Sequence, residues 1–223
     1  MSKHLAREME RIERSTLTLG TMVEEAIDKA TVALVNRRPQ LAKDVIIGDE
    51  LIDEREVELE EECLKVLALY QPVAVDLRYI IATIKVNASL ERMGDLAQNL
   101  AQCARDLSRL EPLDAPIDLL SVVDLVRSMV KRSLESLVSM DTQLAKDVIT
   151  SDDEVDDSQD EIEGILSQMM QAEPHTIERA MHLISAVKHL ERIADQATNI
   201  AEDVVFMVEG DIIRHGRFNL DDV

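Results

Sequence analysis

Aromatic residues are almost absent from this sequence, which has no Trp, two Tyr and two Phe among 223 residues. Glycine and proline are scarce too, with six and five copies, so the chain has few places to turn sharply. Sandwiches and barrels need many turns and favour aromatic and β-branched residues, so the composition argues against both. The 46% of apolar residues must build a core from Leu, Ile, Val, Ala and Met, as packed helices do.

Positive charge is also in short supply, with 24 Lys and Arg against 45 Asp and Glu and a formal net charge of −21. Clustered cations bind nucleic acids and anionic membranes, so we expect neither as a partner. No apolar run is long enough for a signal peptide or a membrane span; we expect no direct membrane insertion and a cytoplasmic protein. Cys63 and Cys103 lie in apolar helical segments and are interpreted as small hydrophobes, not as a disulfide.

What the sequence does have is an internal repeat of about a hundred residues. The segment QLAKDVI occurs at residues 40–46 and returns unchanged at residues 143–149. LERMGDLAQNLAQ at residues 90–102 returns as LERIADQATNIAE at residues 190–202, with 7 of 13 positions identical. The chain is therefore predicted to contain two copies of one structural unit.

Apolar residues recur at helical spacing in both copies, which predicts three helices in each. The predicted helices span about residues 8–38, 39–70, 72–107, 117–140, 143–171 and 174–209. Short links favour antiparallel neighbours, and Gly210 is placed to end the last helix. The Pro-dense connector at residues 111–116 separates the copies, which we place at residues 1–111 and 112–223. The predicted fold is all-α, with two tandem, similar three-helix bundles built from six long antiparallel helices.

Carboxylates occupy one face of the third helix in each copy. At 100° per residue, Glu91 and Asp95 continue an apolar stripe over residues 77–88 that should face the other helices, and Glu191 and Asp195 repeat this arrangement. The second helix of each copy carries a matching acidic row: Asp49, Asp53, Glu56 and Glu60, then Asp152, Asp156 and Glu163. Two neighbouring helices would thus offer carboxylates to one groove, where like charges take up protons or recruit hard cations through oxygen.

A solvated surface is the alternative interpretation of these rows. Residues 49–62 hold 9 acidic residues among 14, residues 152–163 hold 8 among 12, and acidic runs on helices ordinarily face water. A single Glu-x-x-x-Asp pair would not separate the two interpretations. The preserved helical phase in both copies, together with the matching row, is what supports a metal site.

No catalytic constellation accompanies the carboxylates. No His follows a Glu by three residues, which argues against the signature of ferritin-like di-iron oxidases. The sequence has no Gly-rich phosphate loop, no nucleophile elbow and no zinc-spaced Cys or His pair. His189 lies about 160° around the helix from Glu191 and is interpreted as a solvated or core-edge residue. We therefore expect a protein that is not an enzyme.

Three segments resemble the PhoU family, the phosphate-transport accessory and regulatory proteins of bacteria. They are QPVAVDLRYIIATIKVNASLERMGDLAQNLA at residues 71–101, the acidic IIGDELIDE element and LERIADQATNIAE. The resemblance extends from about Glu8 to His215, and the doubled LER-x-x-D-x-x-x-N element is specific. It implies a pair of three-helix bundles with multinuclear metal sites built from Glu/Asp-x-x-x-Asp elements.

Carried over by position, the resemblance implies two metal sites, formed by Asp49, Asp53, Glu91 and Asp95 and by Asp152, Asp156, Glu191 and Asp195. Candidate neighbours of these ligands are Asn99, Asn199 and Glu202. Family members are described with iron, zinc or lighter divalent ions, so iron, zinc, manganese and magnesium all stay open. The second copy departs from the first in having Ala194 for Gly94 and Glu202 for Gln102.

The resemblance implies a cytoplasmic adaptor that negatively regulates the phosphate-starvation response and phosphate uptake. Its partners would be the ATPase subunit of the phosphate ABC transporter and the sensor histidine kinase of the phosphate regulon. Two alternatives stay open: a carboxylate-bridged metalloenzyme such as a phosphoesterase, and a metal-free helical interaction module. No general acid or base has convincing spacing, which favours the adaptor. The long apolar stripes are also consistent with a homodimer, and direct phosphate binding stays open.

Overall fold

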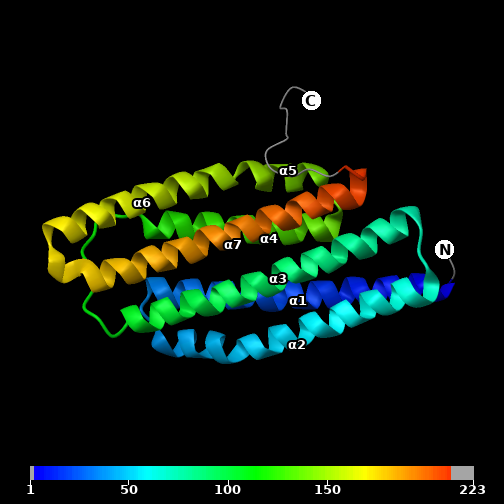
Figure 1. Ribbon diagram of the computed structural model, residues 1–223, viewed down its shortest axis with the longest axis horizontal. Helices are drawn as coiled ribbons and strands as arrows, with labels where there is room; N and C mark the ends of the chain where they lie inside the picture. The colour runs from blue at the N-terminus through cyan, green and yellow to red at the C-terminus, as the bar shows by residue number, and fades with distance from the viewer. Residues whose placement is uncertain (1–2, 212–223) are drawn as a thin grey trace, which may run out of the picture.

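The computed structural model describes residues 3–211, and within that range the chain is helical without any β-strand. The first copy contains α1 (Lys3–Val35), α2 (Pro39–Tyr70) and α3 (Ala74–Leu107). The second contains α4 (Leu119–Ser139), α5 (Thr142–Thr150), α6 (Asp152–Ala172), the 3₁₀ turn η1 (Pro174–Thr176) and α7 (Ile177–Glu209). The predicted all-α fold of two tandem three-helix bundles is confirmed (Figure 1).

The helix boundaries follow from local chemistry. Pro39 opens α2 at a position where its missing N–H costs nothing. Asp141 caps α5, because its side chain accepts hydrogen bonds from the backbone N–H groups of Gln143 and Leu144 at 2.9 and 3.0 Å. Gly210 ends α7 as predicted: it adopts a left-handed φ of 85°, and its N–H bonds to the carbonyl of Phe206 at 3.0 Å.

The second helix of the second copy is interrupted, whereas the sequence predicted one continuous helix over residues 143–171. The break falls at Ser151, between α5 and α6. The hydroxyls of Thr150 and Ser151 both donate to the carbonyl of Asp147, at 3.0 and 2.8 Å, and such side-chain bonding to a preceding turn bends helices. The equivalent residues of the first copy, Ile47 and Gly48, have no hydroxyl, and α2 is continuous there.

The two copies meet chiefly along α3 and α7, which run antiparallel beside each other (Figure 1). α2 packs against the outer side of α3, α5 and α6 pack against α7, and α1 and α4 complete the two bundles. The core consists of aliphatic residues, among them Leu90, Leu190 and Ile193, each fully buried. Cys63 is buried and Cys103 is half-buried, and both are free.

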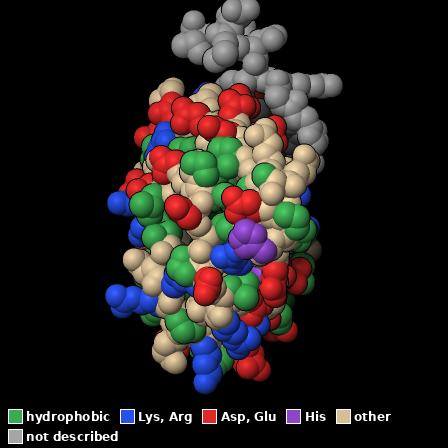
Figure 2. All heavy atoms as spheres, turned by 90° about the vertical axis from the view of Figure 1, so that its left-hand side faces the viewer, with side chains coloured by type: hydrophobic (Ala, Val, Ile, Leu, Met, Phe, Trp, Pro, Cys, Tyr) green, Lys and Arg blue, Asp and Glu red, His purple; other side chains and the backbone are tan. Residues whose placement is uncertain are grey.

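One end of the molecule, where α6 leads to α7 and α3 leads towards α4, carries a mixed surface. Acidic, basic and apolar side chains are interspersed there (Figure 2). The strong negative charge of the chain is therefore not concentrated at this end. None of the described helices combines the length and the apolar character needed to cross a membrane.

Candidate functional site

The first acidic groove lies between α2 and α3. Asp49, on α2, is only 5% exposed, and the side-chain amide of Gln98 on α3 donates a 2.6 Å hydrogen bond to its Oδ2. Burial and the nearby carboxylates of Asp53 and Asp95 raise the pKa of Asp49 to about 6, against the opposing effect of Gln98. The acidic residues predicted on the two helices therefore act on one another across the groove.

Glu91 completes this first cluster. Burial raises the pKa of Glu91, and the carboxylates of Asp95 and Asp53 raise it further. Arg92, its neighbour in the chain, opposes this effect. The four residues predicted for the first site, Asp49, Asp53, Glu91 and Asp95, are thus brought into one electrostatic cluster.

Gly94 explains how α2 and α3 approach so closely at the first groove. A Cβ at this position would lie 3.0 Å from Cγ2 of Ile52 and 3.4 Å from Oδ1 of Asp49. The second copy has Ala194 at the equivalent position, opposite the helix that is broken just before Asp152. The two grooves therefore have equivalent Asp and Glu residues, but the backbones that carry these residues differ in shape.

The second groove lies between α6 and α7. Burial and the carboxylates of Asp195 and Asp156 raise the pKa of Asp152 to about 6, while the nearby hydroxyl of Thr198 lowers it. The pKa of Glu191 is raised to about 7, chiefly by burial and then by the carboxylates of Asp195, Asp156 and Asp152. The four residues predicted for the second site are therefore also brought together.

Burial and neighbouring carboxylates also raise the pKa of the two remaining residues of the second cluster. For Asp195 the carboxylate is that of Asp156, with Arg192 opposing it. For Asp156 the acidic neighbours lie on its own helix: Asp153, Asp160 and Asp157. The second cluster holds an excess of negative charge that its nearest arginine only partly offsets.

The carboxylates of α3 and α7 do not continue an inward-facing stripe. Asp95 and Asp195 are exposed, and Glu91 and Glu191 are half-buried. Leu77, predicted to lie on the inward stripe, is 39% exposed. The stripe prediction is wrong at its ends, because α3 and α7 are covered by other helices over only part of their circumference.

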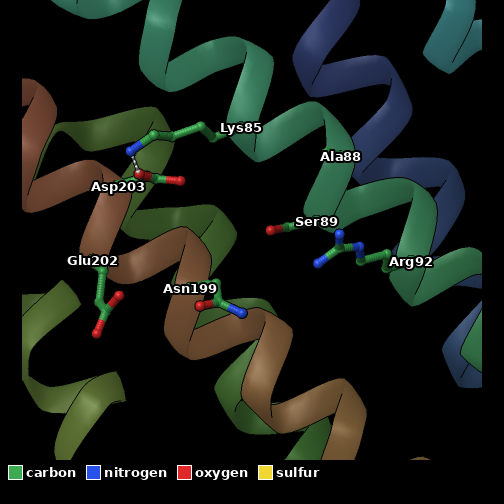
Figure 3. A pocket seen from close by; sticks show the side chains of 7 residues that line it. All are labelled: Lys85, Ala88, Ser89, Arg92, Asn199, Glu202 and Asp203. Carbon is green, nitrogen blue, oxygen red and sulfur yellow. Dashed lines mark hydrogen bonds and ion pairs between the residues drawn. The ribbon is translucent and has the colours of Figure 1, made fainter. Parts of the chain in front are cut away.

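The predicted neighbours of the ligands occupy other places. Asn199 and Glu202 line a cavity between α3 and α7, on the seam between the two copies (Figure 3). Asn99 is half-buried on α3. Their predicted role beside a metal stays a prediction, and for Asn199 and Glu202 the cavity offers a second environment.

Three residues near the grooves were given no role in the sequence analysis. Gln98 binds Asp49, and Thr198, at the equivalent position of the second copy, lies beside Asp152. Within the described range, the hydroxyl oxygen of Thr198 has no hydrogen bond of ordinary geometry. Asn87 donates to the side chain of Glu56 at 2.8 Å and to its carbonyl at 3.0 Å. The shared position of Gln98 and Thr198 within the repeat, one turn beyond Asp95 and its equivalent, is the signal that could have identified them.

The donor set of each groove suits a hard or borderline cation. Carboxylate oxygens on two adjacent helices are the ligands that such cations take in helical bundles. Burial is the main reason why the pKa values of Asp49, Asp152 and Glu191 are raised, and repulsion by neighbouring carboxylates adds to it. A cation would relieve that repulsion. In residues 3–211, no three Asp, Glu, His or Cys side chains already stand together as a finished ligand set. Metal binding would therefore require the carboxylates to turn towards the ion.

His189 occupies the edge of the core. It is half-buried, and its Nδ1 has no hydrogen-bond partner among the residues that the structure describes. Burial and the charge of Arg192 lower its pKa. The neutral imidazole is therefore favoured, which agrees with the interpretation of His189 as a core-edge residue and not as part of the acidic groove.

Comparison with known proteins identifies the fold and the repeat. The model of the PhoU domain matches residues 16–104 and 119–204. A phosphate-specific transport system accessory protein PhoU homolog of Aquifex aeolicus is 42% identical over 211 residues, which cover 95% of this chain and 96% of that protein. The accessory protein PhoU of Escherichia coli is 32% identical, with 96% of this chain and 91% of that protein covered.

A solved structure agrees with these matches. The crystal structure of PhoU from Pseudomonas aeruginosa has a TM-score of 0.88 and 33% sequence identity to this chain, and covers 92% of this chain and 99% of that one. The domain thus occurs twice, each time over one of the three-helix units, and the relatives match nearly end to end. This chain belongs to the PhoU family.

Proposed function

We propose that this chain is a cytoplasmic, non-enzymatic adaptor that negatively regulates phosphate uptake and the phosphate-starvation response. Its partners would be the ATPase subunit of the phosphate ABC transporter and the sensor histidine kinase of the phosphate regulon. The names of the relatives as accessory proteins of the phosphate-specific transport system support the link to phosphate transport. The proposal includes a homodimer as the working form.

The observation that carries the proposal is the pair of acidic grooves, in which burial and neighbouring carboxylates raise the pKa of Asp49 and Glu91 in the first and of Asp152 and Glu191 in the second. The first would hold metal through Asp49, Asp53, Glu91 and Asp95, and the second through Asp152, Asp156, Glu191 and Asp195. A bound iron, zinc, manganese or magnesium ion would supply positive charge that offsets the repulsion. The carboxylates would then hold α2 against α3 and α6 against α7 in one fixed arrangement.

The grooves give the adaptor a way to distinguish states of its partners. A protein can shift an equilibrium between two states only by binding one of them more tightly. Metal-held grooves would present a rigid surface to the ATPase subunit and the kinase, whereas metal-free grooves would repel any acidic surface. The carboxylates would thereby control partner affinity without any chemical step.

The test compares binding of two variants to the purified ATPase subunit and the kinase. In the groove variant, Glu91, Asp95, Glu191 and Asp195 are replaced by Ala. In the control variant, four exposed carboxylates of α2 and α6 are replaced by Ala: Glu54, Glu61, Glu154 and Glu161. Both variants lose the same formal charge, so only the position of that charge differs.

We expect the groove variant to lose at least about tenfold in affinity for the ATPase subunit, and the control variant to retain the parental affinity. In the native organism, the groove variant should also raise expression of a phosphate-starvation reporter in high phosphate. Equal affinity of the parent and both variants for both partners would contradict the proposal that the grooves control binding.

A further inference from the structure

A cavity of about 400 Å³ lies between α3 and α7, where the two copies meet (Figure 3). It is lined by Lys85, Ala88, Ser89 and Arg92 of α3 and by Asn199, Glu202 and Asp203 of α7. The cavity is separate from the acidic grooves, which lie between α2 and α3 and between α6 and α7. Its walls come from both copies, so a ligand that contacts both walls would bridge them.

Three hydrogen-bonding side chains point into this cavity. The guanidinium of Arg92 and the hydroxyl of Ser89 come from α3, and the amide of Asn199 comes from α7 on the other side of the cavity (Figure 3). Within residues 3–211, none of these three side chains forms a hydrogen bond or ion pair with another residue. Guanidinium, hydroxyl and amide groups all donate hydrogen bonds, so the cavity offers several donors from both copies.

The charges around the cavity leave the guanidinium of Arg92 available to a ligand. Asp203 is bound by Lys85, whose Nζ lies 2.6 Å from Oδ1 and 4.9 Å from the centroid of the Phe206 ring. The carboxylate of Glu202 points away from Arg92 (Figure 3). Glu91, the chain neighbour of Arg92, faces the first acidic cluster. The positive charge of Arg92 therefore faces the cavity without an acidic hydrogen-bond partner.

We propose that this cavity binds a tetrahedral oxyanion, inorganic phosphate, held by Arg92, Ser89 and Asn199. The planar fork of an arginine matches two phosphate oxygens, and a hydroxyl and an amide N–H suit the others. Phosphate at neutral pH also keeps a proton, which the amide oxygen of Asn199 accepts. Sulfate has no such proton, so the cavity favours phosphate over an ion of the same shape.

The identification of the oxyanion as phosphate rests on the proposed function as well as on the acceptor oxygen of Asn199, whereas the cavity and its donors are independent of that function. Because Arg92 and Ser89 belong to the first copy and Asn199 to the second, a bound phosphate would fix the seam between α3 and α7. Phosphate would then act on the arrangement of the two copies. This would be a route by which a regulator of phosphate transport senses phosphate itself.

The second copy supplies a matched control for Arg92. Arg192 is its equivalent in the repeat and is likewise exposed next to a glutamate of an acidic cluster. In the second copy His189, which is half-buried, stands where Ser89 stands in the first, and Lys188 pairs with Glu163 at 3.5 Å. Replacing Arg192 therefore removes the same charge without removing a donor from this cavity.

The test is a titration of the full-length chain with phosphate, in which isothermal titration calorimetry and ³¹P NMR measure binding. A chelator removes metal ions, and sodium chloride keeps the ionic strength constant, because exposed charges are screened by salt. Parent, Arg92→Ala and Arg192→Ala are compared, with sulfate as the second ligand. Circular dichroism and thermal unfolding show that each variant is folded.

We expect saturable phosphate binding by the parent, weakened about tenfold or more in Arg92→Ala and changed less than about twofold in Arg192→Ala. The proposal is overturned if the parent shows no saturable binding, if both arginine variants lose affinity equally, or if sulfate binds as tightly as phosphate. The titration contains no metal and no partner, so its failure leaves the adaptor proposal intact.

Discussion

The side-chain amide of Gln98 donates a 2.6 Å hydrogen bond to the carboxylate of Asp49, and this bond joins α3 to α2 at the first acidic groove. Asp49 is the most buried acid of the groove, at 5% exposed, and Asp53 and Asp95 repel its charge. Gln98 is therefore the residue that stabilises the ionised form of Asp49 when no cation is present.

Replacing Gln98 by Leu should destabilise the protein at pH 7.5. A buried carboxylate that loses its hydrogen-bond donor costs about 1–3 kcal/mol in unfolding free energy. Protonation of Asp49 relieves this cost, so the loss should shrink at pH 5. Chemical denaturation of the metal-free protein at both pH values measures the effect.

The control for this change is Gln40→Leu, which removes an exposed amide–carboxylate hydrogen bond to Asp44 at the start of α2. This substitution should change the unfolding free energy by less than about 0.5 kcal/mol at both pH values. If Gln98→Leu is as mild as Gln40→Leu, Gln98 does not support the ionised form of Asp49.

Replacing Gly94 by Ala should test the close approach of α2 and α3. Ala is favoured over Gly in a helix by about 1 kcal/mol, but the added methyl would crowd Ile52 and Asp49, and overpacking costs about 1–3 kcal/mol. Gly48→Ala is the control, because a Cβ there meets nothing within 4 Å. In thermal unfolding, the melting temperature of Gly48→Ala should be higher than that of the parent, and the melting temperature of Gly94→Ala should be lower. An equal increase in both variants would contradict the close packing at Gly94.

The metal-free protein should become more stable as the pH falls from 8 to 5. The pKa values of Asp49 and Asp152 are raised from 3.8 to about 6, and that of Glu191 from 4.5 to about 7. Over this range the folded form therefore binds protons that the unfolded form releases. The stabilisation that these protons provide is lost as the pH rises through the raised pKa values. Thermal unfolding at several pH values measures the change.

The comparison for this pH dependence is a variant with Asp49→Asn, Asp152→Asn and Glu191→Gln, which cannot titrate at these positions. Its stability should depend on pH less steeply than that of the parent between pH 5 and 8. A variant with Glu54→Gln, Glu61→Gln and Glu154→Gln should keep the parental slope. Identical slopes in all three proteins would contradict the raised pKa values.

The ion pair between Lys85 and Asp203 should stabilise the seam between the two copies. Asp203 is 9% exposed, and the Lys85 side chain also lies over the ring of Phe206. Lys85→Met removes the cation beside a largely buried carboxylate and should lower the unfolding free energy by about 1–3 kcal/mol. Lys29→Met removes an exposed pair with Glu25 and should change it by less than about 0.5 kcal/mol. A loss no larger than that of Lys29→Met would contradict the role of this pair.

The fold was largely predictable from the sequence, because the repeat and the helical spacing both act locally. Pro39 and Gly210 mark helix ends through their own backbone preferences, and the predicted helix start at residue 39 and helix end at Gly210 were both correct. The break at Ser151 was not, because it depends on two hydroxyls that compete for the carbonyl of Asp147. Such competition leaves no trace in the hydrophobic pattern.

The sequence predicted which residues form the candidate site, but it did not predict how exposed their carboxylates are to solvent. Helical phase placed Glu91 and Asp95 on one face, and the structure brings Asp49 to them across the groove. How deeply each carboxylate is buried depends on how much of α3 the other helices cover, which the sequence of one helix does not specify. The cavity beside Arg92 likewise depends on how the two copies pack, and no motif in the sequence marked it.

Elemental analysis of the protein purified without chelator measures whether the two carboxylate clusters bind metal. The groove variant (Glu91, Asp95, Glu191 and Asp195 to Ala) and the control variant (Glu54, Glu61, Glu154 and Glu161 to Ala) are purified in parallel. We expect bound iron, zinc, manganese or magnesium in the parent and the control variant, and loss of that metal from the groove variant. A folded parent without bound metal, or a groove variant that retains the parental metal content, would contradict this expectation.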